Sequence, residues 1–255
     1  MLLAVDVGNS KIALGIFEDG KLKTHLSIAT SIHRSSDEYG ALLFGLLPYH
    51  GVAREDLKEA ILCSVVPPLV PIFEELCQRY IGIDLLVVEP GVKTGVRINM
   101  DNPREVGPDR IVNAAAAYGL YGGPAIVIDL GTATTFDVIS EDGSYIGGAI
   151  APGMEAATEA LFTRTARLPR IELVRPQTAI GKNTVTAMQS GVLFGYVGLV
   201  EGLIARIDRE LGGKARVIAT GGYGDLIARE TKVIDVVNRH LTLYGLQLIF
   251  DLNRD

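Results

Sequence analysis

The chain has 255 residues, 48% of them hydrophobic, with 30 acidic against 24 basic side chains and a formal net charge of −6. This length is sufficient for two domains, since domains of roughly 100–150 residues are the commonest size. The acidic balance, together with the absence of any run of basic residues, argues against a nucleic-acid-binding face, which needs clustered Lys and Arg.

Cysteine and histidine are too sparse for a structural metal site or a disulfide framework. The two cysteines form no CxxC pair, and the four histidines match neither HxxH nor HExxH spacing. The N-terminus lacks the basic start of a signal peptide and carries Asp6 inside its apolar stretch. The longest uncharged helical stretch, residues 185–200, is shorter than the ~20 residues that a membrane span needs. We therefore expect a cytoplasmic protein that binds neither nucleic acid nor membrane.

An internal repeat is the most informative feature of the sequence. Residues 2–22, LLAVDVGNSKIALGIFEDGKL, align without gaps with residues 125–145, AIVIDLGTATTFDVISEDGSY. The identical pairs are Asp6 and Asp129, Gly8 and Gly131, Ile16 and Ile139, and the triplets 18–20 and 141–143. Each copy predicts an apolar strand, a polar turn and a second strand, followed by an Asp-Gly hairpin signal. The alternative is that two unrelated hairpins happen to look alike.

The elements that follow the hairpins also correspond in the two halves. The first half predicts a strand over 58–64, a helix over 69–79 and a strand over 85–88. The second predicts a long helix over 183–211, a strand over 214–220, a helix after the glycine-rich 221–224 and a strand over 233–237. Strands that alternate with crossover helices indicate an α/β fold. We divide the chain into domains 1–117 and 118–255 at a linker over 118–124, with a C-terminal helix over 241–252 that can return to the first half.

The repeated turn has the composition of a phosphate-binding loop. Glycine lets the backbone approach an anion closely, so that N–H groups can face phosphate oxygens. A carboxylate at the strand end, such as Asp6, can hold a hydrated Mg²⁺ against the same phosphates. The candidate phosphate-binding residues are Asp6, Val7, Gly8, Asn9, Ser10 and Lys11 in the first turn and Gly131 and Thr132 in the second. A single turn of this kind could equally be an ordinary turn with capping polar groups.

The motifs resemble one particular superfamily of ATPases. The chain contains neither GxxxxGK[ST] nor GxGxxG after a strand. Instead DVGNS, DLGTATT and the Gly-Gly turn in ATGGYG resemble the two phosphate motifs and the adenosine motif of the actin/hexokinase/Hsp70 superfamily. Within it, DNPREVGPDRIVNA, GGAIAPG and GKNTVTAMQSG are similar to segments of type III pantothenate kinase. The resemblance covers nearly the whole chain and implies two ribonuclease-H-like (actin-like ATPase) domains, mixed sheets flanked by helices, with a nucleotide cleft between them.

The GPDR segment is the candidate for the reacting site. Gly107 and Pro108 predict the start of a helix that continues to about Tyr118, and Asp109 then lies at the positive end of the helix dipole. That place favours the ionised carboxylate, which can accept a proton from an alcohol. Arg110 offers a planar donor fork for a substrate carboxylate or amide. Without the resemblance, the pair could be an N-terminal helix acid beside a surface arginine.

The resemblance implies transfer of the ATP γ-phosphoryl group to the 4′-hydroxyl of pantothenate, the first step of coenzyme A synthesis. It places the catalytic base at Asp109 and substrate contacts at Gly107, Pro108, Asp109, Arg110 and Thr184. It implies nucleotide contacts at the first turn, at Thr132 and at the adenosine turn Gly221 and Gly222, with Mg²⁺ on the Asp6 side. It also implies a monovalent cation, K⁺ or NH₄⁺, at Asp129, which could instead be a second carboxylate that faces magnesium.

One position departs from the family pattern. Met100 stands where the family usually has a tyrosine that contacts the substrate, and a thioether cannot donate the hydrogen bond of a phenol. Either another donor substitutes, or substrate affinity is weaker, or the acceptor differs, so a kinase of the superfamily with another hydroxyl substrate stays open. A non-catalytic regulatory relative is the second alternative, although Asp6, Asp109 and the second Asp-x-Gly are all present.

The resemblance further implies a homodimer in which the pantothenate pocket is completed at the interface, where Thr184 contacts the substrate. Four glycines of the predicted long helix share one helical face: Gly191, Gly195, Gly198 and Gly202. Small residues on one face allow the close approach of another helix, either in the core or from a second subunit.

Overall fold

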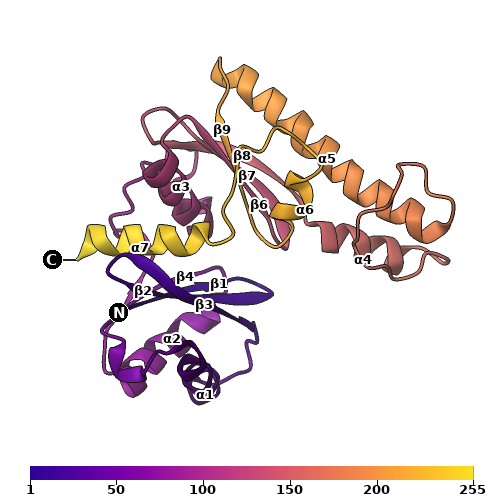
Figure 1. The fold of residues 1–255 in the computed structure, drawn as a ribbon. Helices are drawn as coiled ribbons and strands as arrows, with labels where there is room; N and C mark the ends of the chain where they lie inside the picture. Colours follow the sequence, from indigo (N-terminus) through magenta and orange to yellow (C-terminus); the bar gives the residue numbers. More distant parts are fainter. Residues whose placement is uncertain (255) are drawn as a thin grey trace. The chain divides into compact units, whose positions relative to one another are not determined.

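The computed structural model describes residues 1–254, which fold into two compact units (Figure 1). The first unit comprises Met1–Arg97, Asp101–Gly119 and the C-terminal segment from His240. The second comprises Leu120–Arg239 and the short segment Ile98–Met100. This differs from the predicted division at 117/118, because the C-terminal helix belongs to the first unit and residues 98–100 to the second.

The first unit is built on a five-stranded mixed sheet with the strand order β3-β2-β1-β4-β5. The strands are β1 (Leu2–Val7), β2 (Lys11–Glu18), β3 (Lys21–Ala29), β4 (Glu59–Ser64) and β5 (Leu85–Val87). β1 pairs antiparallel with β2 and parallel with β4, and β4 pairs parallel with β5. The chain therefore forms a three-stranded meander and then adds two parallel strands through helical crossovers. The sequence predicts the opening hairpin and the last two strands with the helix between them, but it gives no bounds for β3 or for the helix between β3 and β4.

Helices cover both faces of this sheet. On one face α1 (Ser36–Leu46) and α2 (Val70–Leu76) pack on the odd-numbered residues of β1, with Tyr39 and Phe73 fully buried between them (Figure 1). On the other face, α3 (Pro108–Tyr121) and α7 (Leu241–Asn253) pack on Leu2 and Ala4. Because successive strand residues point to opposite faces, Asp6 lies on the α3–α7 face.

The second unit repeats this sheet. Its strand order is β10-β9-β6-β7-β8, which matches the first sheet strand for strand. The strands are β6 (Ala125–Leu130), β7 (Ala133–Ile139), β8 (Tyr145–Pro152), β9 (Arg216–Thr220) and β10 (Val236–Val237). β6 pairs antiparallel with β7 and parallel with β9, as β1 does with β2 and β4. The same topology confirms that the hairpin repeat reflects two equivalent domains rather than a chance likeness.

Three helices pack on one face of the second sheet. They are α4 (Met154–Arg164), α5 (Thr184–Leu211) and α6 (Gly224–Ala228). Their core includes Ile126, Ile128 and Leu130 of β6 together with Val200 and Ile204 of α5. Asp129 therefore points to the opposite face, as Asp6 does in the first unit.

Several boundaries differ from the sequence prediction. The helix predicted over 69–79 consists of α2 followed by a π-helical turn, Cys77–Ile81, and β10 keeps only two residues of the strand predicted over 233–237. The linker predicted over 118–124 begins as the last turn of α3. The remaining short elements are 3₁₀ turns at Leu47–His50, Arg54–Asp56, Pro67–Leu69 and Pro103–Glu105.

By length and composition, α5 is the one helix within residues 1–254 that could cross a membrane. Its most apolar window is 39% buried, and its buried side chains pack on the second sheet. Such a helix also serves as the core helix of a globular unit, so its length and composition are weak evidence for a membrane span. The cytoplasmic location stays a prediction.

Candidate active site

The first acidic turn joins β1 to β2 and is tightly held by its own backbone. The Gly8 N–H donates to the Lys11 carbonyl at 3.0 Å, and the Thr30 hydroxyl donates to the Gly8 carbonyl at 2.7 Å. A Cβ on Gly8 would lie 3.0 Å from the Lys11 carbonyl oxygen, so a larger residue would require the turn to shift by a few tenths of an ångström. Asn9, Ser10 and Lys11 are exposed. The turn therefore presents polar groups to solvent from a fixed backbone.

Asp6 and Asp109 come together around a buried thiol. Asp6 pairs in register with Cys63 of β4, and both lie on the sheet face that α3 covers. Burial raises the pKa of Cys63 well above its usual value, and the negative charges of Asp6 and Asp109 raise it further. Cys63 therefore stays protonated at neutral pH and adds no third charge. The structure thus brings the strand-end carboxylate and the candidate base to one place in the first unit.

Asp109 lies in the first turn of α3, which begins at Pro108 as the sequence predicts. Its carboxylate accepts a hydrogen bond from the Arg110 N–H at 2.9 Å. A Cβ on Gly107 would lie 2.5 Å from the Asp109 Oδ1, so glycine makes room for this carboxylate. Burial raises the pKa of Asp109, while the hydrogen bond and charge of Arg110 act in the opposite direction. A carboxylate with a raised pKa is a stronger proton acceptor.

The second acidic turn is also closed by a backbone hydrogen bond from its glycine, but it is one residue shorter than the first. The Gly131 N–H donates to the Ala133 carbonyl at 3.0 Å, two residues on, whereas the Gly8 N–H reaches three residues on to Lys11. Gly153, at the end of β8, packs so close that its Cβ would lie 2.3 Å from the Thr132 carbonyl oxygen. Thr132 itself is exposed. The segment that leads into α4 therefore packs directly against this turn.

The adenosine turn packs against the same corner. Gly221 has φ +84°, and a Cβ there would lie 2.6 Å from the Asp129 Oδ1 and 2.6 Å from the Leu130 carbonyl carbon. Only glycine fits both the conformation and the space. The Tyr223 N–H donates to the Leu130 carbonyl at 3.4 Å, and Gly222 is exposed. The candidate nucleotide residues of the second unit therefore form one group, although they are distant in sequence.

Met100 lies beside β8. The backbone before it extends the sheet edge, because Ile98 bridges to Tyr145 and the Asn99 N–H donates to the Tyr145 carbonyl at 2.8 Å. The Met100 sulfur is 3.4 Å from the place of a Cβ on Gly147. Met100 is half-buried, and its side chain packs on the strand.

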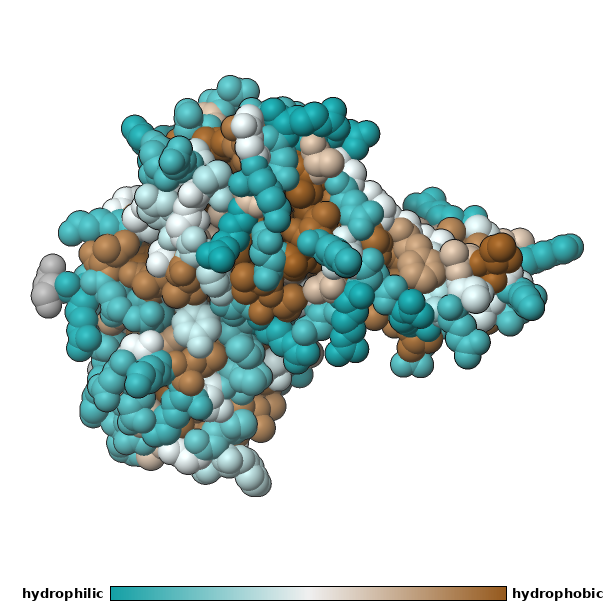
Figure 2. Space-filling view, turned by 45° about the horizontal axis from the view of Figure 1, so that its top comes forward, coloured by the Kyte–Doolittle hydropathy of each residue, from teal (hydrophilic) through white to brown (hydrophobic). Residues whose placement is uncertain are grey.

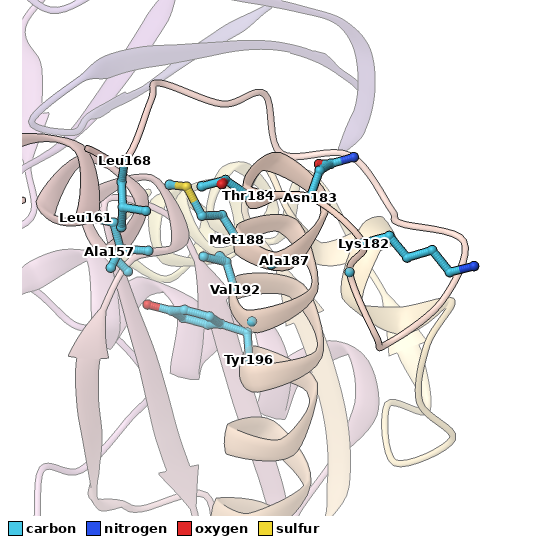
Figure 3. A pocket seen from close by; sticks show the side chains of 12 residues that line it. Ala157, Leu161, Leu168, Lys182, Asn183, Thr184, Ala187, Met188, Val192 and Tyr196 are labelled. Carbon is cyan, nitrogen blue, oxygen red and sulfur yellow. The ribbon is translucent and has the colours of Figure 1, made fainter.

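Thr184 lies at the mouth of an open groove of about 790 Å³ between α4 and α5 (Figure 3). Met188, Val192 and Tyr196 project from α5 towards Ala157 and Leu161 of α4, whereas the Lys182 amine points away from the groove. The full lining is Ala157, Leu161, Leu168, Gly181, Lys182, Asn183, Thr184, Ala187, Met188, Gly191, Val192 and Tyr196. Most of this lining is apolar, so the groove favours a hydrophobic occupant.

The candidate cation ligands are two carboxylates. No cluster of three or more His, Cys, Asp or Glu able to hold a metal occurs within residues 1–254. Magnesium prefers one or two carboxylates together with waters and phosphate oxygens, so it does not need such a cluster. Asp6 and Asp129, each half-buried at a strand end beside a glycine turn, fit such oxygen coordination.

Sequence reasoning missed two groups at these corners. It treated Cys63 only as an apolar residue, although the alignment of β1 with β4 places it opposite Asp6. It also did not identify α4, whose first turn carries Glu155, the hydrogen-bond partner of Tyr223. The available signal was GGAIAPG, whose last glycine precedes the helix.

The comparisons with known proteins identify the family. The family model for type III pantothenate kinase matches residues 2–206. A type III pantothenate kinase of Dehalococcoides mccartyi is 53% identical over 253 residues, covering 99% of this chain and 98% of the relative. One from Moorella thermoacetica is 54% identical over 253 residues, covering 99% of this chain and 100% of the relative.

Solved structures support the fold. A Baf family protein from Campylobacter jejuni has a TM-score of 0.62 at 20% identity and covers 98% of each chain. The activator of 2-hydroxyisocaproyl-CoA dehydratase from Clostridium difficile, solved with bound ADPNP, has a TM-score of 0.53 at 12% identity, covering 98% of this chain and 94% of that one. These likenesses confirm the duplicated actin-like ATPase fold. With a matched family model and relatives more than half identical over almost their whole length, the chain belongs to the type III pantothenate kinase family.

Proposed function

We propose that this protein phosphorylates pantothenate on its 4′-hydroxyl with ATP as the phosphoryl donor, giving 4′-phosphopantothenate and ADP, the first step of coenzyme A synthesis. The observation that carries the proposal is the 53% identity to a type III pantothenate kinase over 253 residues. The convergence of Asp6 and Asp109 on Cys63 supports it, because a kinase needs a phosphate-side carboxylate and a base close together.

In this mechanism Asp109 is the general base. Its carboxylate accepts the proton of the 4′-hydroxyl as the hydroxyl oxygen forms its bond to the γ-phosphorus, and the bond from that phosphorus to the ADP oxygen breaks. Phosphoryl transfer needs mainly positioning and charge neutralisation, so the base orients the nucleophile as much as it activates it. The helix start fixes the carboxylate, and burial keeps it basic.

The glycine turns hold the nucleotide in this proposal. Asp6, Val7, Gly8, Asn9, Ser10 and Lys11 contact phosphate from the first unit, and Gly131, Thr132, Gly221 and Gly222 contact the nucleotide from the second. Asp6 would hold the Mg²⁺ that accompanies ATP, which would supply charge neutralisation at the phosphates, and Asp129 would hold K⁺ or NH₄⁺. The hydrogen-bonded backbones of both turns and the half-buried carboxylates at the two strand ends support these assignments.

Pantothenate contacts Gly107, Pro108, Asp109 and Arg110 in this proposal, with Arg110 paired to its carboxylate or amide. Met100 and Thr184 complete the substrate contacts, Met100 through its thioether and Thr184 through its hydroxyl. The missing phenol at position 100 favours a second candidate, a kinase for a related alcohol, and this is why acceptors are compared below.

We infer a homodimer in which α4 and α5 form the interface and Thr184 serves the active site near it. Three glycines of the α5 face, Gly191, Gly195 and Gly198, are exposed, and nothing lies within 4 Å of the position that a Cβ would take on any of them. Figure 2 shows patches of hydrophobic surface at the right of the view. The exposed apolar side chains of the second unit include Phe162, Val174 at 45% and Ile180 at 81% exposure. A patch of this kind marks a protein–protein contact.

The dimer is tested by Gly195→Leu, which places a bulky side chain on the exposed α5 face. Sedimentation should show a monomer, and pantothenate turnover should fall with it. Gly45→Leu is the matched control, because Gly45 is also an exposed helical glycine with open space around it. A Gly195→Leu protein that sediments as a dimer would refute this interface.

The function is tested by measuring ADP release with ATP and a panel of alcohols that includes pantothenate, with K⁺, NH₄⁺ or Na⁺ present. Pantothenate should give the highest kcat/KM, and K⁺ or NH₄⁺ should support turnover better than Na⁺. Asp109→Asn should lose about 10²- to 10⁴-fold in kcat, the usual contribution of a general base. Asp84→Asn, at an exposed acid of the same unit, is the control. Equal turnover by wild type and Asp109→Asn would remove the proposed base.

A further inference from the structure

A hydrogen bond between two side chains joins the adenosine turn to the start of α4. The Tyr223 hydroxyl donates to the Glu155 Oε1 at 2.7 Å. Tyr223 follows the glycines after β9, and Glu155 lies in the first turn of α4 after β8. The pair is partly accessible, since Tyr223 is half-buried and Glu155 is exposed.

This bond spans the edge of the second sheet at which the second acidic turn lies. In the order β10-β9-β6-β7-β8, the strands β9 and β8 are separated by β6 and β7. At ~4.8 Å between neighbouring strands, the ends of β9 and β8 are about 14 Å apart. The turn that joins β6 to β7 lies between them. The Tyr223–Glu155 bond therefore links the two segments that flank this turn.

One end of the link is anchored in the core. The Tyr196 hydroxyl of α5 donates to the Pro152 carbonyl at 2.6 Å, and Gly153 packs on the Thr132 carbonyl. The start of α4 is thus fixed relative to the sheet. The other end is held to the second acidic turn by a long backbone bond, from the Tyr223 N–H to the Leu130 carbonyl at 3.4 Å, and by the packing of Gly221 on Leu130. The side-chain bond adds a restraint between the adenosine turn and α4.

The restrained segment includes Gly221, which packs on the Asp129 carboxylate. If the adenosine turn moves away, the packing around Asp129 opens and the nucleotide contacts proposed for Gly221 and Gly222 are lost. Burial and the bond to Glu155 raise the pKa of Tyr223 to about 12. The hydroxyl therefore keeps its proton, and can donate, throughout the physiological range.

We propose that Tyr223 and Glu155 act as a pair of positioning residues for the nucleotide, which hold the adenosine turn against the second acidic turn. The inference rests on the proposed function only in assigning ATP as the ligand of these turns. Breaking the pair should weaken nucleotide binding while leaving pantothenate binding and the chemical step unchanged, since neither side chain belongs to the Asp109 site.

Tyr223→Phe and Glu155→Ala each remove the bond. The double variant loses the same single bond and no other. We expect the KM for ATP to rise about three- to tenfold in each single variant. This is the effect of losing one hydrogen bond to a charged group, reduced because the pair is partly exposed to solvent. The double variant should be no worse than the singles. Glu155→Gln keeps an acceptor oxygen, so its KM should fall between wild type and Glu155→Ala. The kcat and the KM for pantothenate should stay at wild-type values.

Tyr80→Phe is the matched control. The Tyr80 hydroxyl also donates to a carboxylate, that of Asp37, but the pair lies among the helices of the first unit, away from both acidic turns. It should leave both KM values unchanged. Thermal unfolding of every variant separates positioning from folding, because a merely structural pair would lower Tm and change kcat and both KM values together. That outcome overturns the proposal, as does an unchanged KM for ATP.

Direct calorimetric titration of each variant with ADP and with the nonhydrolysable ATP analogue ADPNP, without pantothenate, separates this proposal from the proposed function. If wild type binds nucleotide but does not phosphorylate pantothenate, the proposed function is refuted. The positioning role of Tyr223 and Glu155 is still tested, by the change in the Kd for nucleotide between wild type and the variants. An unchanged nucleotide Kd in Tyr223→Phe overturns the pair whatever the acceptor substrate.

Discussion

Replacing Gly245 with alanine should destabilise the protein, because the added methyl group would clash with α3 where α7 packs against it. Gly245 is buried in the middle of α7, and a Cβ there would lie 2.2 Å from the Val112 carbonyl oxygen and 2.7 Å from the Val112 Cγ1. An ordinary carbon–oxygen contact is more than 3 Å, so the two backbones would have to separate. The helices are also joined side by side by the Thr242 hydroxyl, which donates to the Asn113 Oδ1 at 2.8 Å.

The magnitude combines two opposed effects. Overpacking of this kind costs about 3 kcal/mol at the upper end of its usual range. Alanine gains about 1 kcal/mol over glycine in a helix interior. The net loss is therefore about 2 kcal/mol, which lowers Tm by about 4–8 °C for a chain of this size. Turnover should fall as well, because Val112 lies one helical turn after Asp109 and a misplacement of about 1 Å can cost up to 10²-fold in rate.

Urea unfolding followed by circular dichroism measures the free-energy change, and Gly45→Ala is the control. Gly45 is an exposed glycine of α1 with nothing within 4 Å of its Cβ position. There only the helix-propensity gain remains, so Gly45→Ala should be more stable than wild type by about 1 kcal/mol. If Gly245→Ala proved as stable as Gly45→Ala, the close approach of α7 to α3 would be wrong.

Three further changes give distinct outcomes. Because burial raises the pKa of Asp109 in the folded state, its ionisation disfavours folding. At pH 7 Asp109→Asn should therefore unfold at a higher temperature than wild type, although it is inactive. This difference in unfolding temperature should vanish as the pH falls below the ordinary Asp pKa near 3.9. A variant less stable than wild type at pH 7 would contradict the reasoning. Thr134→Val should raise the unfolding free energy by about 1 kcal/mol in urea titrations, because the Thr134 hydroxyl is buried without a hydrogen-bond partner within residues 1–254; a clear loss of stability would mean that this hydroxyl does have a partner. Met100→Tyr should lower the KM for pantothenate about three- to tenfold at constant kcat in steady-state assays, since a phenol adds a donor that binds ground and transition states equally; an unchanged KM would place residue 100 outside the substrate site.

The sequence was sufficient to predict the two sheets because their strands carry local signals. The apolar runs before Asp6 and Asp129 and the Asp-Gly hairpin residues fix the strands and turns within a few residues of each other in the chain. The repeat then constrains the topology, since two equivalent halves must share one strand order. The start of α3 at Pro108 was predictable for the same reason, because proline at the first helical position acts locally.

What the sequence could not predict depends on contacts between distant segments. No local pattern shows that Cys63 lies opposite Asp6 and feels the charge of Asp109, because this follows from the parallel pairing of β1 with β4 and the packing of α3 over both. The two-residue length of β10 was likewise invisible, since its apolar run continues where pairing with β9 ends. The placement of α7 in the first unit is also determined by tertiary contacts, those that it makes with β1 and β4.

The two acidic turns begin alike, with an Asp-x-Gly at a strand end, but they differ in length and in what surrounds the carboxylate. Asp6 faces a protonated thiol and the start of α3, a setting open enough at Asn9 and Ser10 for an anion and its cation to approach. Asp129 is instead pressed by Gly221, where no side chain other than hydrogen fits. The two corners therefore differ on one side of the carboxylate: the adenosine turn packs on Asp129, whereas Asp6 pairs in register with Cys63.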